Sequence, residues 1–134
     1  MKAFDYKIDI VTPAPPRSRK GNRITALRWG RFLRDLGHKV RILESWSSGR
    51  PDLLIALHAR RSHASLRNFR KSHPDRPAIL ALTGTDVYSD IHTDARAQES
   101  LDLADRYITL QTEAVKELPV ELRYRAHVIH QSFT

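Results

Sequence analysis

Near its centre the chain reads Asp52-Leu53-Leu54-Ile55-Ala56-Leu57-His58, an almost continuously apolar run of strand length. Such a run is typical of a central strand in a parallel sheet, because helices cover both faces of that sheet. Further along, Ala78-Ile79-Leu80-Ala81-Leu82 repeats the pattern. The two runs together predict a buried parallel sheet.

Shorter strand patterns alternate with helical ones on both sides of these runs. Strands are predicted over 7–12, 38–43, 107–110 and 127–130, and helices over 22–36, 60–72, 94–104 and 113–118. Strands that alternate with helices at short spacing imply right-handed βαβ crossovers. The 134 residues therefore predict one Rossmann-like, three-layer α/β domain over 1–134 with a mostly parallel sheet.

The helix predicted over 22–36 has a one-sided apolar pattern. Trp29, Phe32, Leu33 and Leu36 recur at helical spacing, so we expect this face to cover the sheet. Gly37 is placed to end the helix. In the same way, Asp94 is placed to cap the helix over 94–104.

Composition narrows the function classes. The formal net charge is +8, from 23 Lys and Arg against 15 Asp and Glu, and this favours an anionic partner such as nucleic acid or a phosphorylated small molecule. There is no cysteine, so disulfides and thiolate metal sites are excluded. Charges interrupt the N-terminus where a signal peptide would be apolar, and no run is long enough to span a membrane. We expect a soluble, cytoplasmic protein.

Polar stretches follow four of the predicted strands. The first, within Val11–Arg23, has three prolines and then several cations around Gly21, where a helix is about to start. The others are 58–62, 83–86 and 130–132. Because the carboxyl ends of parallel strands meet at one edge, we expect these stretches to converge on a shared rim that can bind an anion.

Each of these signals also has a structural interpretation. The first loop can be a solvated basic turn, and Arg60 and Arg61 can lie in a solvated helical turn. His58 can be a hydrogen-bonded histidine at a strand end, and Thr85 or Asp86 can cap the next segment. No Gly-x-Gly-x-x-Gly, P-loop or Gly-x-Ser-x-Gly motif is present. His127 and His130 are predicted on opposite faces of a strand, so we expect no metal site.

Five blocks of the sequence carry a resemblance to a known family. These blocks are residues 10–16, 18–29, 57–65, 82–86 and 128–132. The first block reads Ile10-Val11-Thr12-Pro13-Ala14-Pro15-Pro16. Together they resemble a branch of the retaining-type GT-B glycosyltransferases, that of the selenosugar synthases of selenoneine biosynthesis. Gly84-Thr85-Asp86 is shared more widely among GT-B enzymes, whereas the blocks 10–16 and 57–65 are specific to this branch.

The resemblance implies an activity and a division of labour. Enzymes of this branch transfer N-acetylglucosamine from its UDP donor to selenophosphate and form a carbon–selenium bond. GT-B enzymes have two Rossmann-like domains, of which the N-terminal one mainly receives the acceptor and the C-terminal one holds the nucleotide sugar. The chain would be the N-terminal half, inactive alone, and Glu113 and Glu121 would not inherit the role of the paired glutamates of the other half.

The resemblance also implies a set of acceptor- and anion-binding residues, whereas it leaves the catalytic residues unknown and implies no cofactor. The expected ligand is a small anionic acceptor, selenophosphate or a phosphate-like group. The candidate residues are Arg19, Lys20, Gly21, Asn22, Thr25, Arg28, His58, Arg60, Arg61, Thr83, Gly84, Thr85 and Asp86.

The alternative function is a basic nucleic-acid-binding module, which the +8 charge and the many arginines suggest. Aromatic residues make up only 7% of the chain and are not interleaved with the basic loop. A platform for single-stranded nucleic acid needs such aromatics for stacking. The glycosyltransferase interpretation is therefore preferred.

Overall fold

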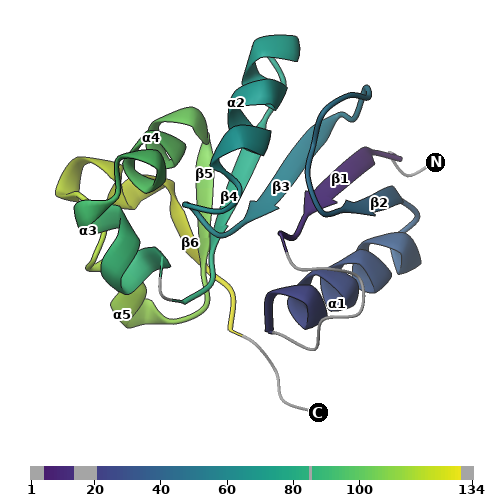
Figure 1. Ribbon diagram of the computed structural model, residues 1–134. Helices are drawn as coiled ribbons and strands as arrows, with labels where there is room; N and C mark the ends of the chain where they lie inside the picture. The colour runs from purple at the N-terminus through teal and green to yellow at the C-terminus, as the bar shows by residue number, and fades with distance from the viewer. Residues whose placement is uncertain (1–4, 14–20, 85, 131–134) are drawn as a thin grey trace.

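A computed structural model describes residues 5–13, 21–84 and 86–130. Among these residues, six parallel strands form one sheet in the order β2-β1-β3-β4-β5-β6 (Figure 1). The strands are β1 (Lys7–Val11), β2 (Lys39–Leu43), β3 (Leu53–Leu57), β4 (Ala78–Leu82), β5 (Arg106–Thr109) and β6 (Ala126–Val128). The predicted central strand, β3, lies between β1 and β4.

Helices lie on both sides of this sheet. In Figure 1, α1 lies on one side at the lower right, while α2, α3 and α4 gather at the top and left. The helices are α1 (Gly21–Asp35), α2 (His63–Ser72), α3 (Ile91–Thr93), α4 (Ala95–Leu103) and α5 (Thr112–Val115), with a π-helical turn η1 (Asp86–Asp90) and a 3-10 helix η2 (Val120–Arg125). The domain is thus a Rossmann-like, three-layer α/β domain, as predicted.

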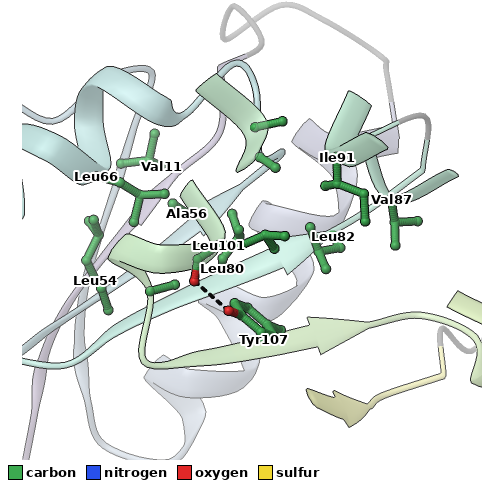
Figure 2. Packing of buried hydrophobic residues seen from close by; sticks show 14 of the residues in the cluster. Val11, Leu54, Ala56, Leu66, Leu80, Leu82, Val87, Ile91, Leu101 and Tyr107 are labelled. Carbon is green, nitrogen blue, oxygen red and sulfur yellow. Dashed lines mark hydrogen bonds between the residues drawn. The ribbon is translucent and has the colours of Figure 1, made fainter. Parts of the chain in front are cut away.

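The core consists of two apolar clusters, one on each face of the sheet. Strand residues alternate between them, so that Leu54 belongs to the cluster under α2 and α4 while Ile55 faces α1. Figure 2 shows the larger cluster, in which Tyr107 is fully buried and its hydroxyl donates a hydrogen bond to the carbonyl of Leu101. Burial on both faces explains the continuous apolar runs of β3 and β4.

Two predicted helix ends are confirmed. Gly37 follows α1 and has a φ of +101°. Its N–H donates a hydrogen bond to the Arg34 carbonyl at 2.9 Å, and the N–H of His38 donates to the Leu33 carbonyl at 3.1 Å. This is the left-handed ending that glycine favours. The Asp94 carboxylate caps α4 by accepting from the backbone N–H groups of Arg96 and Ala97. The hydrogen bond from Ala97 is the largest cause that lowers the pKa of Asp94.

The prediction for the apolar face of α1 is wrong in part. Phe32 and Leu36 are 63% and 54% exposed, and Trp29 and Leu33 are only half-buried. The helix approaches β2 through Gly30 instead, where a Cβ atom would lie 2.9 Å from Cδ1 of Ile42. The buried residues of α1 are the small ones, Thr25, Ala26 and Gly30, so the apolar stripe is turned to one side of the buried face.

Three short elements, η1, α3 and η2, were not predicted, and α2, α5 and β6 are shorter than expected. The π-helical turn η1 with α3 follows β4 directly, and η2 precedes β6. Pro119 is the N-cap of η2, so Glu113 and Glu121 lie in separate elements, α5 and η2. Strand β6 ends at Val128, so His130 lies beyond it and not on the strand.

A buried polar link joins β1 to β2 and the loop after it. Asp9 is 3% exposed and accepts two hydrogen bonds from the Arg41 guanidinium, at 2.8 and 2.7 Å. The indole N–H of Trp46 donates to the same carboxylate at 2.9 Å. The hydrogen bond to Asp9 is the main reason that the pKa of Arg41 is raised.

Candidate functional site

His58 directly follows β3 and has an unusual backbone. Its φ is +80°, a left-handed value that a non-glycine residue adopts rarely, and its side chain is buried. The backbone N–H of Arg61 donates to Nδ1 at 3.1 Å, so the neutral ring carries its proton on Nε2. Nε2 lies 3.8 Å from the Asp90 carboxylate. Strained backbone of this kind is concentrated at functional sites.

The pKa of His58 is lowered from its ordinary value. Burial is the largest cause; Asp86 and Asp90 oppose it, whereas Arg61 and Arg60 lower the pKa further. The imidazole is therefore held neutral near pH 7, with Nε2 as a hydrogen-bond donor.

This lowered pKa predicts a pH dependence of stability. Below its ordinary pKa of about 6.5, His58 takes up a proton more readily in the unfolded chain, so stability should fall as pH drops through that value, by at most about 1.4 kcal/mol per pH unit. Above pH 7 the histidine should contribute no pH dependence. His58→Asn should remove this contribution to the pH dependence of the free energy of unfolding, measured by urea unfolding between pH 7.5 and 5.5. Asparagine is chosen because it tolerates a positive φ. His127→Asn is the control: His127 is exposed, so its replacement should leave this pH dependence unchanged. The same pH dependence in the wild type and in His58→Asn would contradict the role assigned to His58.

Asp86 holds two of the strand-exit loops together. One carboxylate oxygen accepts from the Ala59 N–H at 3.0 Å, and the other accepts from the Gly84 N–H at 2.9 Å. The side chain is completely buried. Asp86 was predicted to bind the anion or to cap the next segment. In the structure its carboxylate joins the end of β3 to the end of β4, so Asp86 positions both loops.

The sequence interpretation missed Asp90, at the end of η1. Its carboxylate lies 3.2 Å from Nε of Arg60 and faces His58 as well. Arg60 precedes α2, which begins at His63, so it does not lie in the predicted helical turn. The spacing of four residues between Asp86 and Asp90 was the available signal, but it has meaning only once η1 is known to be helical.

A basic hollow of about 470 Å³ lies where β1 and β3 end. It is lined by Pro13, Arg60, Arg61, His63, Ala64 and Arg96, and none of these described lining residues is acidic. Strand order reverses between β1 and β3, because β2 lies on one side of β1 and the later strands lie on the other. Ligands of doubly wound sheets bind at such a switch point, outside the carboxyl ends of the strands.

Three side chains that line the basic hollow also contact acidic residues. His63 Nε2 lies 2.7 Å from Glu99, and Arg96 lies 3.3 Å from Asp94. Together with the contact of Arg60 to Asp90, these contacts orient the side chains that line the hollow. Arg61 is exposed, and its guanidinium is available to a ligand from solvent.

A second hollow of about 340 Å³, here called the β4–β5 hollow, lies at the ends of β4 and β5. It is lined by apolar and polar residues: Leu82, Thr83, Gly84, Val87, Tyr88, Leu110, Gln111, Ala114 and His130. The Tyr88 hydroxyl donates to the Gln111 amide oxygen at 3.3 Å. Thr83, Gly84 and His130, from two predicted rim stretches, thus line the same hollow.

Only part of the predicted set is brought together. His58, Arg60, Arg61, Thr83, Gly84 and Asp86 lie at the strand-exit rim, whereas Arg19, Lys20 and Thr85 lie outside the described residues. Gly21, Asn22, Thr25 and Arg28 lie on the first two turns of α1 and line neither hollow, and Thr25 is buried. Within the described ranges, no group of three or more His, Asp or Glu side chains could hold a metal ion.

Comparison with known proteins identifies no class of protein more specific than the fold. No protein-family model matches the chain, and no curated protein matches it. Of the helices in the described ranges, none is both long and apolar enough to cross a bilayer. Fold and rim define a Rossmann-like parallel α/β domain with a basic hollow at its switch point.

Proposed function

We propose that this chain is the acceptor-side domain of a GT-B-type glycosyltransferase and that the basic hollow binds a small, dense anion. The resemblance to the selenosugar synthases suggests selenophosphate as that anion, with N-acetylglucosamine transferred to it from the UDP sugar. The nucleotide sugar would be held by a second Rossmann-like domain. The three-layer fold supports the proposal, because a GT-B enzyme uses it for each half.

The observation that carries the proposal is the position of Arg60, Arg61 and Arg96 around one hollow at the switch point. Guanidinium groups form paired hydrogen bonds with phosphate oxygens, so three of them suit a multiply charged anion. The β4–β5 hollow is lined by hydroxyl, amide, imidazole and apolar groups, which suit an uncharged sugar ring. His58 would keep the loop between them in place through its bond to the Arg61 N–H.

Anion binding can be tested with inorganic phosphate and selenophosphate as probes. Titration followed by NMR should shift the amides of 59–64 and 96, and Arg61→Gln or Arg96→Gln should weaken binding at least tenfold. Arg67→Gln is the matched control, because Arg67 is an exposed arginine of α2 outside the hollow. Unchanged affinity in the first two variants, or an equal loss in the control, would overturn the proposed anion site.

The proposed separation of acceptor and donor binding between two domains can be tested separately. The chain alone, given UDP-N-acetylglucosamine and selenophosphate, should show no sugar transfer, because it has no assigned donor site. Sustained turnover by the isolated chain would contradict the acceptor-side role.

A further inference from the structure

The π-helical turn η1 contributes to both hollows at the strand ends. Two of its residues, Val87 and Tyr88, line the β4–β5 hollow. Its last residue, Asp90, contacts Arg60 of the basic hollow, with 3.2 Å between the carboxylate and Nε. Turns of this kind are rare and occur mostly at functional sites. One short segment therefore contacts two hollows that lie at the ends of different strands.

Asp86, the first residue of η1, makes a second link between the hollows. Its carboxylate accepts a hydrogen bond from the N–H of Gly84, which lines the β4–β5 hollow. It also accepts from the N–H of Ala59, the residue before Arg60. Asp86 and Asp90 thus hold the loop after β3 from both ends of η1. A displacement of η1 would therefore change both hollows.

On its other side, η1 is attached to the segment that follows β5. The Tyr88 hydroxyl donates to Oε1 of Gln111 at 3.3 Å, and Gln111 is the N-cap of α5. Both residues line the β4–β5 hollow, and neither lines the basic hollow. Contacts to the loop after β3 and to the segment after β5 together set the position of η1.

Arg60 can bind an anion and keep its contact with η1. A guanidinium group has five N–H donors, and Arg60 uses the one on Nε for Asp90. The terminal nitrogens can then contact a ligand in the basic hollow. An anion held in this way would fix Arg60, and through Asp90 it would fix the end of η1.

We propose that η1 couples the two hollows, so that an anion in the basic hollow strengthens binding of an uncharged ligand in the β4–β5 hollow. The reverse effect has the same size, because coupling between two binding sites is reciprocal. A ligand against Val87 and Tyr88 meets a turn that the anion has already ordered, so less conformational entropy is lost. Joint occupation of the hollows is thereby favoured over occupation of one alone. This inference rests on the proposed anion site.

Inorganic phosphate and the bond between Tyr88 and Gln111 test the coupling. Gln111→Ala should weaken phosphate binding about threefold, measured by NMR titration at the amides of 59–64, although Gln111 does not line the basic hollow. Tyr88→Phe should weaken it by the same factor. The double variant should lose no more than either single variant, because all three lack the same hydrogen bond.

Hydrogen exchange measures the effect in the opposite direction. The Val87 N–H donates to the Gly84 carbonyl at 3.1 Å, at the start of η1. Saturating phosphate should slow exchange of this amide at least threefold in the wild type.

Gln98→Ala and Tyr124→Phe are the matched controls. Both side chains are exposed and line neither hollow, so these variants should leave the phosphate affinity unchanged. Phosphate that fails to bind at 59–64 in the wild type would overturn the anion site and this inference together. If phosphate binds there, the coupling alone is overturned by equal affinity in the wild type, Gln111→Ala and Tyr88→Phe, by an equal loss in the controls, or by unchanged exchange at Val87.

Discussion

Replacement of Arg41 by alanine is expected to lower the free energy of unfolding by about 1–3 kcal/mol, the cost of leaving a buried acceptor without its donor. The reason is the Asp9 carboxylate, which is almost fully buried and accepts two hydrogen bonds from this guanidinium. Without Arg41 it would keep one described side-chain donor, the Trp46 indole. A buried charge that has lost its partner lowers the stability of the protein, even though an intact ion pair stabilises a protein little more than well-packed apolar side chains would. Urea unfolding at pH 7 measures the loss.

Arg34→Ala provides the comparison for this prediction. Arg34 is an exposed arginine that also reaches β2, but it donates to the Val40 carbonyl and not to a buried carboxylate. Its loss should cost below about 1 kcal/mol. Gly49→Ala should reproduce part of the Arg41 effect, because a Cβ there would lie 2.5 Å from the guanidinium and Gly49 has φ +132°. Similar losses for Arg34→Ala and Arg41→Ala would contradict the stabilising role of Arg41 toward the buried Asp9.

Replacement of Asp86 by alanine should destabilise the protein by about 2–4 kcal/mol, because two backbone N–H groups lose their acceptor. These are the N–H groups of Ala59 and Gly84, in the loops that follow β3 and β4. Hydrogen exchange at both amides should become faster, and phosphate binding in the basic hollow should weaken with it. Asp86→Asn, which keeps an oxygen acceptor, should have a smaller effect and provides the measurement if the alanine variant does not fold.

Asp102→Ala is the control for the Asp86 prediction. Asp102 is an exposed carboxylate on α4, far along the chain from either loop. It should leave both amides and the phosphate affinity unchanged. If Asp86→Ala leaves hydrogen exchange at Ala59 and Gly84 unchanged, then Asp86 does not position the rim.

The candidate site was predictable where it depends on strand order. Because parallel strands end at one edge, residues after β3 and β4 were expected together, and His58, Arg60 and Asp86 do lie there. Asp90 was missed because η1 is a π-helical turn without an apolar period of its own. The roles within the rim were also not predictable, since a buried carboxylate and a ligand-binding one look alike in a sequence. Sugar transfer stays a prediction.

The sequence by itself determined the α/β class, the five longer strands and the ends of α1 and α4. These features depend on local properties: apolar periodicity, glycine at a left-handed position and a carboxylate at a helix start. Only the tertiary structure decided how α1 lies on the sheet. Its four apolar residues were expected to be buried, yet Gly30 is buried beside Ile42, whereas Phe32 and Leu36 are largely exposed. A helical period identifies an apolar stripe, but close packing between particular side chains determines which part of that stripe the domain itself buries.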